Sequence, residues 1–304
     1  MRITERTYQN NFLRGVSKNQ TEIERLQRQM EYQTKIFKPS DSPIGAAKSV
    51  RLNDQIKNNE KYMENIENSY AFLQETTTAL DSIHTNVQEL ITMFPTISNA
   101  TYKDQYNEFA DKIDMALDTI LNFANQEFDG KYLFGGTDFA AAPYGDQTPP
   151  PATPPPSRVI ELKTSGTTGT SNVNIGKSLT QSINVKGDDV FGVMGTNDIF
   201  NTLVKISDDL RAGNPPTEAD MQIVEDFEAN VLTQSSKAGN TVNQLLTMKD
   251  ALESQNLELT ELYSNENDVD MTEAALELET YQYNLEVSYK IAAKIMPTSL
   301  LDYL

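Results

Sequence analysis

The sequence predicts a mostly α-helical protein. Segments from the two ends of the chain should form an elongated antiparallel helical-bundle rod, with a small β-rich middle domain inserted between them. Two observations support this prediction. Apolar residues recur at helical spacing in the first and last thirds of the chain, whereas residues 130–195 hold ten of the fourteen glycines. In addition, only 38% of the 304 residues are hydrophobic and the mean hydropathy is -0.51, which suits solvated helices better than a compact globule.

The first helical arm is interrupted early, in the stretch "KIFKPSDSPIGAAKSV". Pro39 and Pro43 rule out a continuous helix through this stretch. Ser42 is a good N-cap, and Pro43 fits the first helical position, where its missing N–H costs nothing. We therefore predict an elbow between a terminal arm and the rod.

Ahead of the elbow, Ile23, Leu26 and Met30 share one helical face, and Phe37 extends it. The signal Thr21-x-x-Glu24 predicts a capping box that begins this helix. Alone, such a short helix is marginally stable, so it needs a partner.

After the elbow, a heptad pattern continues for five and a half repeats, and it predicts a helix from Pro43 to Phe94, about 75 Å long at 1.5 Å per residue. Pro95 is predicted to end this helix, and a second one is expected from Thr101 to Phe128, folding back as an antiparallel hairpin. The predicted seam residues of this region are Ile56, Met63, Ile66, Tyr70, Leu73, Leu80, Val87 and Ile91.

The amino-acid composition changes in the middle of the chain. "TPPPATPPP" (148–156) holds six of the thirteen prolines, which predicts a stiff, extended insert. The segments "RVIEL", "SNVNI" and "QSINVKG" are rich in β-branched residues and are predicted to form short strands.

Helical periodicity returns at "TNDIFNTLVKISDDLRAG" and again after the cap signal Thr217-x-x-Asp220. Asp270 is the predicted N-cap of the last helix, with Glu273 three residues further on. The seam residues predicted for the returning half of the rod are Leu245, Leu252, Leu259 and Leu262.

These patterns divide the chain into three parts. Terminal coiled-coil arms are predicted at 1–40 and 270–304, and a helical rod domain at 41–130 and 196–269. The β-rich middle domain, with its Pro-rich insert, is predicted at 131–195.

Charge and composition exclude several classes of protein. The net charge is -19, so a nucleic-acid partner is not expected. The chain has no cysteine, no apolar run long enough for membrane insertion, and no apolar signal-peptide core at its start. Charge is also uneven: residues 1–38 carry eight basic and four acidic side chains (+4), and residues 253–304 carry two basic and eleven acidic ones (-9). The two ends could therefore attract one another, within a chain or between neighbours.

No catalytic, cofactor-binding or metal-binding site is predicted. His84 is the only histidine and falls at a heptad position, where packing explains it. "GKS" at 176–178 lacks the first glycine of a phosphate loop, and "NENDVDMTE" lacks the glycine of a calcium loop. An enzyme is accordingly not expected.

Three ordered segments resemble the flagellin family. "KPSDSPIGAAKSVRLNDQI" is similar to its Pro-Ser-Asp-x-Pro-x-Gly-Ala-Ala signature, "FDGKYLFGGTD" to its entry into the middle domain, and the last 38 residues to its carboxyl-terminal helix with a leucine-rich tail. The matching elbow residues are Pro39, Ser40, Asp41, Pro43, Gly45, Ala46 and Ala47.

The resemblance implies an axial structural component of the bacterial flagellum, extracellular and exported by the flagellar type III apparatus without a cleaved signal peptide. The junction segment and the short middle region favour a protein joining hook to filament. The implied partners are copies of itself in a ring, a neighbouring hook-associated protein, flagellin, and an export chaperone that binds the C-terminal region.

The terminal arms are expected to order as they pack beside neighbouring subunits, so that Leu285→Asp should leave a folded rod but block assembly. The predicted assembly interface consists of Ile23, Leu26, Met30, Leu278, Leu285, Ala292, Ile295, Leu300, Leu301 and Leu304. For each residue taken alone, a place in the core of its own chain explains the pattern equally well. Two other functions stay open: a filament-forming flagellin, and a secreted coiled-coil adhesin or effector that binds a host surface through its β insertion.

Overall fold

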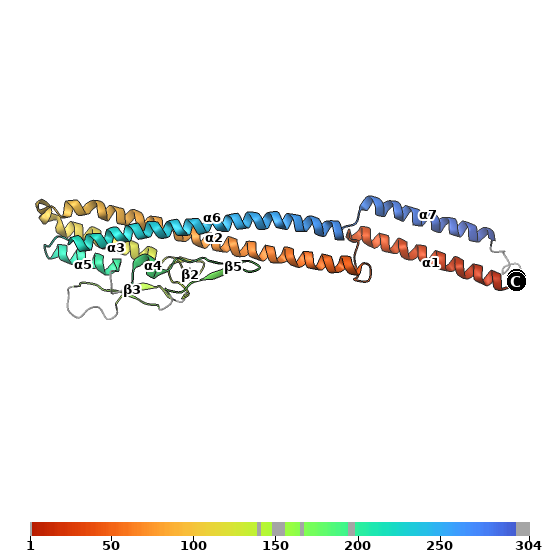
Figure 1. Ribbon diagram of the computed structural model, residues 1–304, viewed down its shortest axis with the longest axis horizontal. Helices are drawn as coiled ribbons and strands as arrows, with labels where there is room; N and C mark the ends of the chain where they lie inside the picture. Colours follow the sequence, from red (N-terminus) through yellow and green to blue (C-terminus); the bar gives the residue numbers. More distant parts are fainter. Residues whose placement is uncertain (1, 139–140, 148–155, 165–166, 194–197, 296–304) are drawn as a thin grey trace. The chain divides into compact units, whose positions relative to one another are not determined.

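The computed structural model describes residues 2–138, 141–147, 156–164, 167–193 and 198–295 (Figure 1). Long helices from both ends of the chain dominate it, and short strands occupy the middle. The helices are α1 (Arg2–Tyr32), α2 (Pro43–Ile97), α3 (Tyr106–Ala124), α4 (Gly187–Phe191), α5 (Ile199–Arg211), α6 (Glu218–Asn267) and α7 (Met271–Ile295), with a 3-10 helix over Ala100–Gln105. The prediction of a mostly α-helical chain with a small β-containing middle segment is confirmed.

The chain separates into two compact units. Unit 1 contains residues 1–58 and 254–304, and unit 2 contains residues 59–253. Helices α2 and α6 each contribute residues to both units. The three-part division expected from the sequence stays a prediction, and most of the Pro-rich insert (148–155) lies outside the described residues.

The predicted break between the first two helices is confirmed. Helix α1 ends at Tyr32, and Gln33 follows it at φ 57°, a left-handed conformation typical of helix ends. Helix α2 begins at Pro43, and Ser42 caps it by accepting the Gly45 N–H at 3.2 Å.

The predicted start of the first helix at Thr21 is wrong, because α1 already begins at Arg2. The Thr21 hydroxyl donates to the Ser17 carbonyl at 3.0 Å, as threonines inside helices do, and does not act as a cap. The helix extends so far back because it packs on α7, which supplies the apolar partner that an isolated helix would lack.

Two predicted helix ends also differ from the structure. Pro95 lies inside α2, which continues to Ile97, and Phe128 lies in a strand because α3 ends at Ala124. A proline one turn from a helix end removes a single hydrogen bond, and burial of Phe94 and Ile97 beside it offsets that loss.

Helices α2 and α6 form an antiparallel pair. Within unit 2, His84 Nε2 lies 2.7 Å from Glu228 Oε1, Ser235 Oγ donates to Asp81 at 3.0 Å, and Lys249 Nζ lies 3.5 Å from Glu67 Oε2. Because one residue number rises as its partner's falls, the two helices run in opposite directions. The contact with Glu228 places His84 between these two helices.

The predicted seam residues of this pair differ in burial. Ile66, Leu73, Leu80, Val87, Leu245 and Leu252 are buried, Ile56, Met63, Tyr70, Ile91 and Leu259 are half-buried, and Leu262 is exposed. The sequence pattern missed a third buried stripe of α2, formed by Ser69, Thr76, Ile83, Leu90 and Ile97. A helix with one partner needs two seam positions per heptad, so the third stripe indicates packing on more than one side.

The strands form three separate antiparallel hairpins within the described residues, and they confirm the predicted β-containing segment. They pair β1 (Glu127–Phe128) with β2 (Lys131–Tyr132), β3 (Tyr144–Asp146) with β4 (Ile160–Leu162), and β5 (Asn172–Gly176) with β6 (Leu179–Ser182). Asp129 and Gly130, both at positive φ, make the two-residue turn of the first hairpin. Arg158 ties the second hairpin to α3 by pairing with both Asp146 and Asp118, and the hydrogen bond to Asp146 is the main reason that its pKa is raised.

An aromatic cluster forms the core where the hairpins meet the helices of unit 2. The ring of Phe191 lies 5.2 Å from the rings of Phe134, Tyr144 and Phe200, and 6.1 Å from that of Phe227. These rings come from α4, α5, α6, β3 and the segment after β2, so the cluster joins elements from distant parts of the sequence.

The hydroxyl of Tyr144 is the exception in this core, because it is buried without a hydrogen-bond partner among the described residues. Burial raises the pKa of Tyr144, so the phenol stays neutral at ordinary pH. We expect Tyr144→Phe to raise the free energy of unfolding by about 1 kcal/mol, because an unpaired hydroxyl no longer has to be desolvated. Urea unfolding of the purified chain checks this, and a loss of stability would contradict it.

Candidate assembly surfaces

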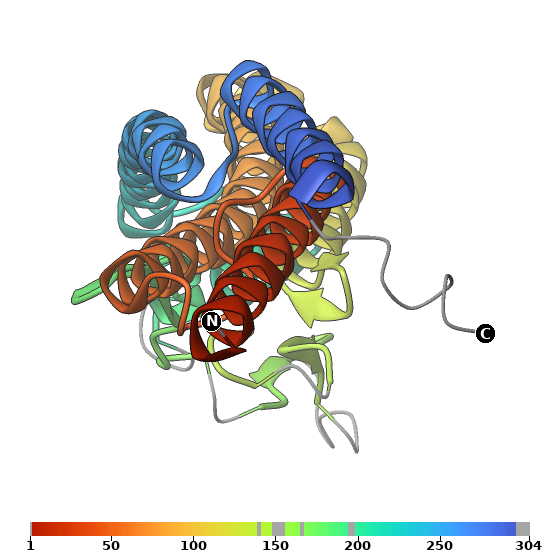
Figure 2. The same ribbon diagram turned by 90° about the vertical axis from the view of Figure 1, so that its right-hand side faces the viewer.

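Helices α1 and α7 form an antiparallel pair in unit 1 and lie side by side in both ribbon views (Figures 1 and 2). Leu26 of α1 and Ala274 of α7 are buried. At the edge of the pair, Arg25 approaches Glu277 at 3.7 Å, and Gln20 Nε2 donates to the Tyr289 hydroxyl at 3.4 Å. Among the described residues of the terminal segments, the main contact is therefore that between α1 and α7.

The predicted interface residues lie mainly on the faces with which this pair meets. Leu26 is buried, and Ile23, Met30, Leu278, Leu285 and Ala292 are half-buried. Because this face of α7 packs on α1, an aspartate at Leu285 is expected to disturb the pair itself. Ile295 ends α7, and its side chain, like Leu300, Leu301 and Leu304, lies outside what the structure describes. Their role between subunits stays a prediction.

The sequence pattern missed a second apolar face on α7. Leu276, Tyr283 and Ile291 are 62%, 64% and 45% exposed, and the half-buried Val287 lies between Tyr283 and Ile291. Their spacing of four to eight residues places them on one side of the helix, opposite the side packed on α1. We call these four residues the outer α7 face. Helical periodicity could have shown it, because α7 is apolar on two opposite sides.

Local hydrogen bonds stabilise the turn of the elbow. The Asp41 carboxylate accepts the N–H groups of Phe37 and Lys38 at 3.1 and 2.9 Å. The hydrogen bond from Lys38 is the main reason that the pKa of Asp41 is lowered. The other motif residues, Pro39, Ser40 and Ala47, are exposed, and Ala46 is half-buried.

A side chain at Gly45 would crowd the ends of neighbouring side chains. A Cβ atom there would lie 2.8 Å from Ile36 Cδ1 and 3.0 Å from Glu266 Oε1. Next to it, Lys48 Nζ pairs with Glu266 Oε2 at 2.6 Å, so the start of α2 rests against the end of α6. The elbow is thus a packed joint within unit 1.

The segment that connects α1 to α2 contacts the segment that connects α6 to α7 at this joint. Thr34 and Asp268 form an antiparallel bridge, the Lys35 N–H donates to the Asn267 carbonyl at 2.6 Å, and the Val269 N–H donates to the Gln33 carbonyl at 3.2 Å. Asp270 then caps α7 by accepting the N–H groups of Thr272 and Glu273, and the bond from Glu273 is the main reason that its pKa is lowered.

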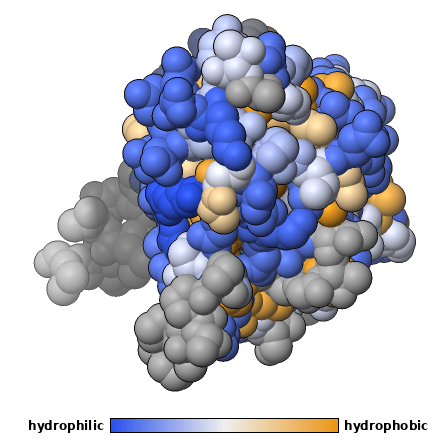
Figure 3. All heavy atoms as spheres, turned by 90° about the vertical axis from the view of Figure 1, so that its left-hand side faces the viewer, coloured by the Kyte–Doolittle hydropathy of each residue, from blue (hydrophilic) through white to orange (hydrophobic). Residues whose placement is uncertain are grey.

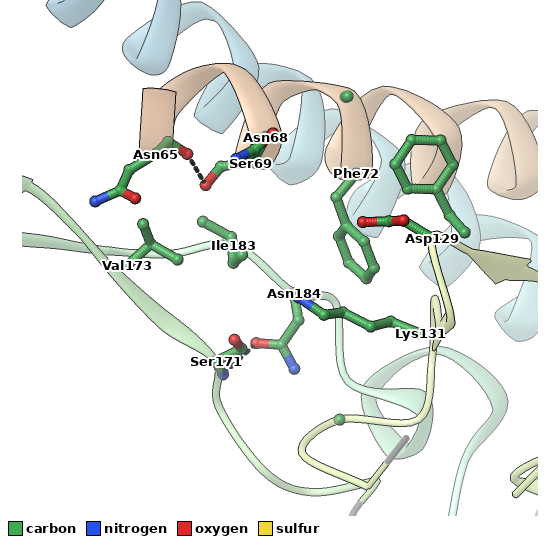
Figure 4. Close-up of a pocket in the computed structure, with 13 residues that line it drawn as sticks. Asn65, Asn68, Ser69, Phe72, Asp129, Lys131, Ser171, Val173, Ile183 and Asn184 are labelled. Atoms are coloured by element: carbon green, nitrogen blue, oxygen red, sulfur yellow. Dashed lines mark hydrogen bonds between the residues drawn. The ribbon is translucent and has the colours of Figure 1, made fainter. Parts of the chain in front are cut away.

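A pocket of about 600 Å³ lies in unit 2 between α2 and the hairpins (Figure 4). Most of its polar groups already have structural partners. Asn65 Nδ2 donates to the Asn174 carbonyl at 2.8 Å, and Asn184 spans the Ser171 N–H and the Gly169 carbonyl, both at 2.8 Å. Its lining therefore serves to attach the β5–β6 hairpin to α2.

The described residues show neither a metal-binding nor a membrane-spanning feature. They contain no cluster of three or more His, Cys, Asp or Glu side chains that could hold a metal ion. No helix among them is both long and apolar enough to cross a membrane. Hydrophilic side chains cover most of the face at which α2 connects to α3, with apolar ones between them (Figure 3).

Comparison with known proteins assigns the family. Residues 3–138 match the bacterial flagellin N-terminal helical region, and residues 221–304 match the bacterial flagellin C-terminal helical region. The chain belongs to the flagellin family. The elbow, α2 and α3 fall within the first match, and α7 within the second.

Relatives within the family include flagellar hook-associated protein 3 of Escherichia coli, which is 25% identical over 98% of both chains. Among solved structures, a protein of Vibrio parahaemolyticus described as a flagellar hook-associated protein has a TM-score of 0.64 at 19% identity, covering 75% of this chain and 100% of its own. The flagellar junction protein FlgL from Legionella pneumophila has a TM-score of 0.54 at 12% identity, covering 74% and 100%. The two structures share the fold of this flagellin-family chain.

Proposed function

We propose that this flagellin-family protein is a structural, axial component of the flagellum that forms the junction between hook and filament. The full-length similarity to a hook-associated protein supports the junction role over that of the filament subunit. The observation that carries a building-block function is the outer α7 face, because a row of large apolar side chains left open on a terminal helix suits packing against another protein.

The proposed partners follow from that position. They are copies of this chain in a ring, a neighbouring hook-associated protein on one side and flagellin on the other. The protein would act outside the cell, after export by the flagellar apparatus without a cleaved signal peptide, and an export chaperone would bind its C-terminal region before assembly.

The proposed mechanism couples assembly to ordering of the terminal helices. Few residues of α1 and α7 are buried among those whose burial the structure describes, and α7 is exposed on one side. Helices with so little buried surface are marginal on their own and gain stability from neighbours. Packing of the outer α7 face beside another subunit would supply that stability.

Deletion of the gene in its own bacterium tests the function. We expect bare hooks with flagellin in the medium, because flagellin would be exported without a base on which to assemble. Electron microscopy of the cells and an assay of the medium measure both results. Bare hooks with a clean medium would identify a filament subunit, and unchanged flagella would favour an adhesin or effector.

A further inference from the structure

One side of α1 is basic and is largely turned away from α7, although Arg25 on it approaches Glu277 of α7. Arg14, Lys18, Arg25 and Arg28 follow one another at spacings of four, seven and three residues, which keeps them on one side of a helix. The opposite side carries the residues that pack on α7, among them Ile23 and Leu26. We call these four residues the basic α1 face.

Most of these charges have no acidic partner in the single chain. Arg25 pairs with Glu22 at 2.7 Å and approaches Glu277 at 3.7 Å. In the part of the chain that the structure describes, Arg14, Lys18 and Arg28 are exposed and form no ion pair. Three cations on one helical face are therefore available to a partner.

The outer α7 face has the complementary charge. Glu273 and Glu279 flank its apolar residues on either side, are exposed, and form no ion pair with any described residue. Lys290 also lies near this face, but its charge is matched by Glu286 at 2.5 Å. The face thus combines an apolar row with acidic edges.

We propose that the basic α1 face of one copy docks on the outer α7 face of the next copy. The stems of Arg and Lys would cover the apolar row while their charged ends reach the flanking glutamates. The inference rests on the proposed function and specifies which surfaces of the copies meet.

Such a contact joins two different surfaces, so it is heterologous. After two copies dock, one of them still presents a free α7 face and the other a free α1 face, and further copies can therefore be added in a single direction around an axis. A ring or a helical array follows from that geometry, whereas a contact between identical faces would stop at a pair.

Charge reversal in the full-length protein tests the contact, with each variant expressed in the deletion strain. The triple variant Arg14→Glu, Lys18→Glu and Arg28→Glu, and the double variant Glu273→Lys and Glu279→Lys, should each lower the number of filaments per cell by about tenfold, because like charges then face each other. Combining both sets in one chain should restore filaments, since opposite charges meet again.

A matched control makes the same change of charge at positions outside the proposed contact. Glu258→Lys with Glu261→Lys changes the charge by the same amount as the α7 double variant, on exposed positions of α6, and should leave filaments unchanged. Circular dichroism of each purified variant verifies that its helix content is retained.

Normal filaments with either single set of reversals, or no recovery in the combined variant, would overturn the proposed contact. These failures are distinct from failure of the proposed function, which would appear as unchanged flagella in the deletion strain itself.

Discussion

Changing Leu276 to lysine is expected to abolish incorporation of the protein into the flagellum while leaving the α1–α7 pair folded. Leu276 is largely exposed in the single chain, so a lysine there disturbs little packing within it. In an assembly that covers the outer α7 face with the basic α1 face, the same ammonium group would be desolvated beside like charges, at a cost of several kcal/mol. We expect filaments per cell to fall by more than about tenfold, counted by electron microscopy in the complemented deletion strain.

Leu257→Lys is the matched control, because Leu257 is 74% exposed and lies on α6 of the same unit. The same chemical change there should leave filaments at the wild-type number. Thermal unfolding followed by circular dichroism should give both variants the wild-type helix content. Normal filaments with Leu276→Lys would mean that the outer α7 face stays in solvent after assembly.

Phe191→Ala is expected to cause the largest loss of stability in unit 2. The ring is fully enclosed by Phe134, Tyr144, Phe200 and Phe227, and its removal leaves a cavity at the point where helices and hairpins meet. Truncations of this kind lower the free energy of unfolding by about 3 to 5 kcal/mol. Urea unfolding of the purified chain measures the loss.

Val193→Ala provides the comparison, since Val193 is two residues away and mostly exposed. Its effect should stay within about 0.5 kcal/mol, the range usual for surface substitutions. If Phe191→Ala cost no more than Val193→Ala, the aromatic cluster would not be the core that holds the hairpins against the helices.

Three helix starts were predicted correctly, because an N-cap is a local interaction between residues three positions apart, whereas α3 begins at Tyr106 and not at Thr101. Ser42 before α2 and Asp270 before α7 accept backbone N–H groups as expected. Thr217 and Asp220 likewise form the predicted reciprocal box at the start of α6. Thr21 shows the limit of this signal, because a threonine inside a longer helix satisfies its hydroxyl with the preceding turn.

Contacts between distant segments could not be predicted from the same patterns. The third buried stripe of α2, which includes Thr76 and Ile83, reflects the number of neighbours around that helix, and periodicity alone does not state that number. The predicted assembly residues were chosen from one apolar stripe of α7, and Leu285 proved to lie on the side that packs on α1. The exposed stripe that includes Tyr283 lies on the opposite side.

The bridge between Thr34 and Asp268 has a mechanical consequence. A single extended segment rotates freely about its backbone bonds, so it transmits tension but almost no torque. Here two connecting segments run side by side at the joint, and the hydrogen bonds from Lys35 to Asn267 and from Val269 to Gln33 fasten them together. Neither segment can rotate without breaking its pairing to the other, and the joint therefore resists twisting.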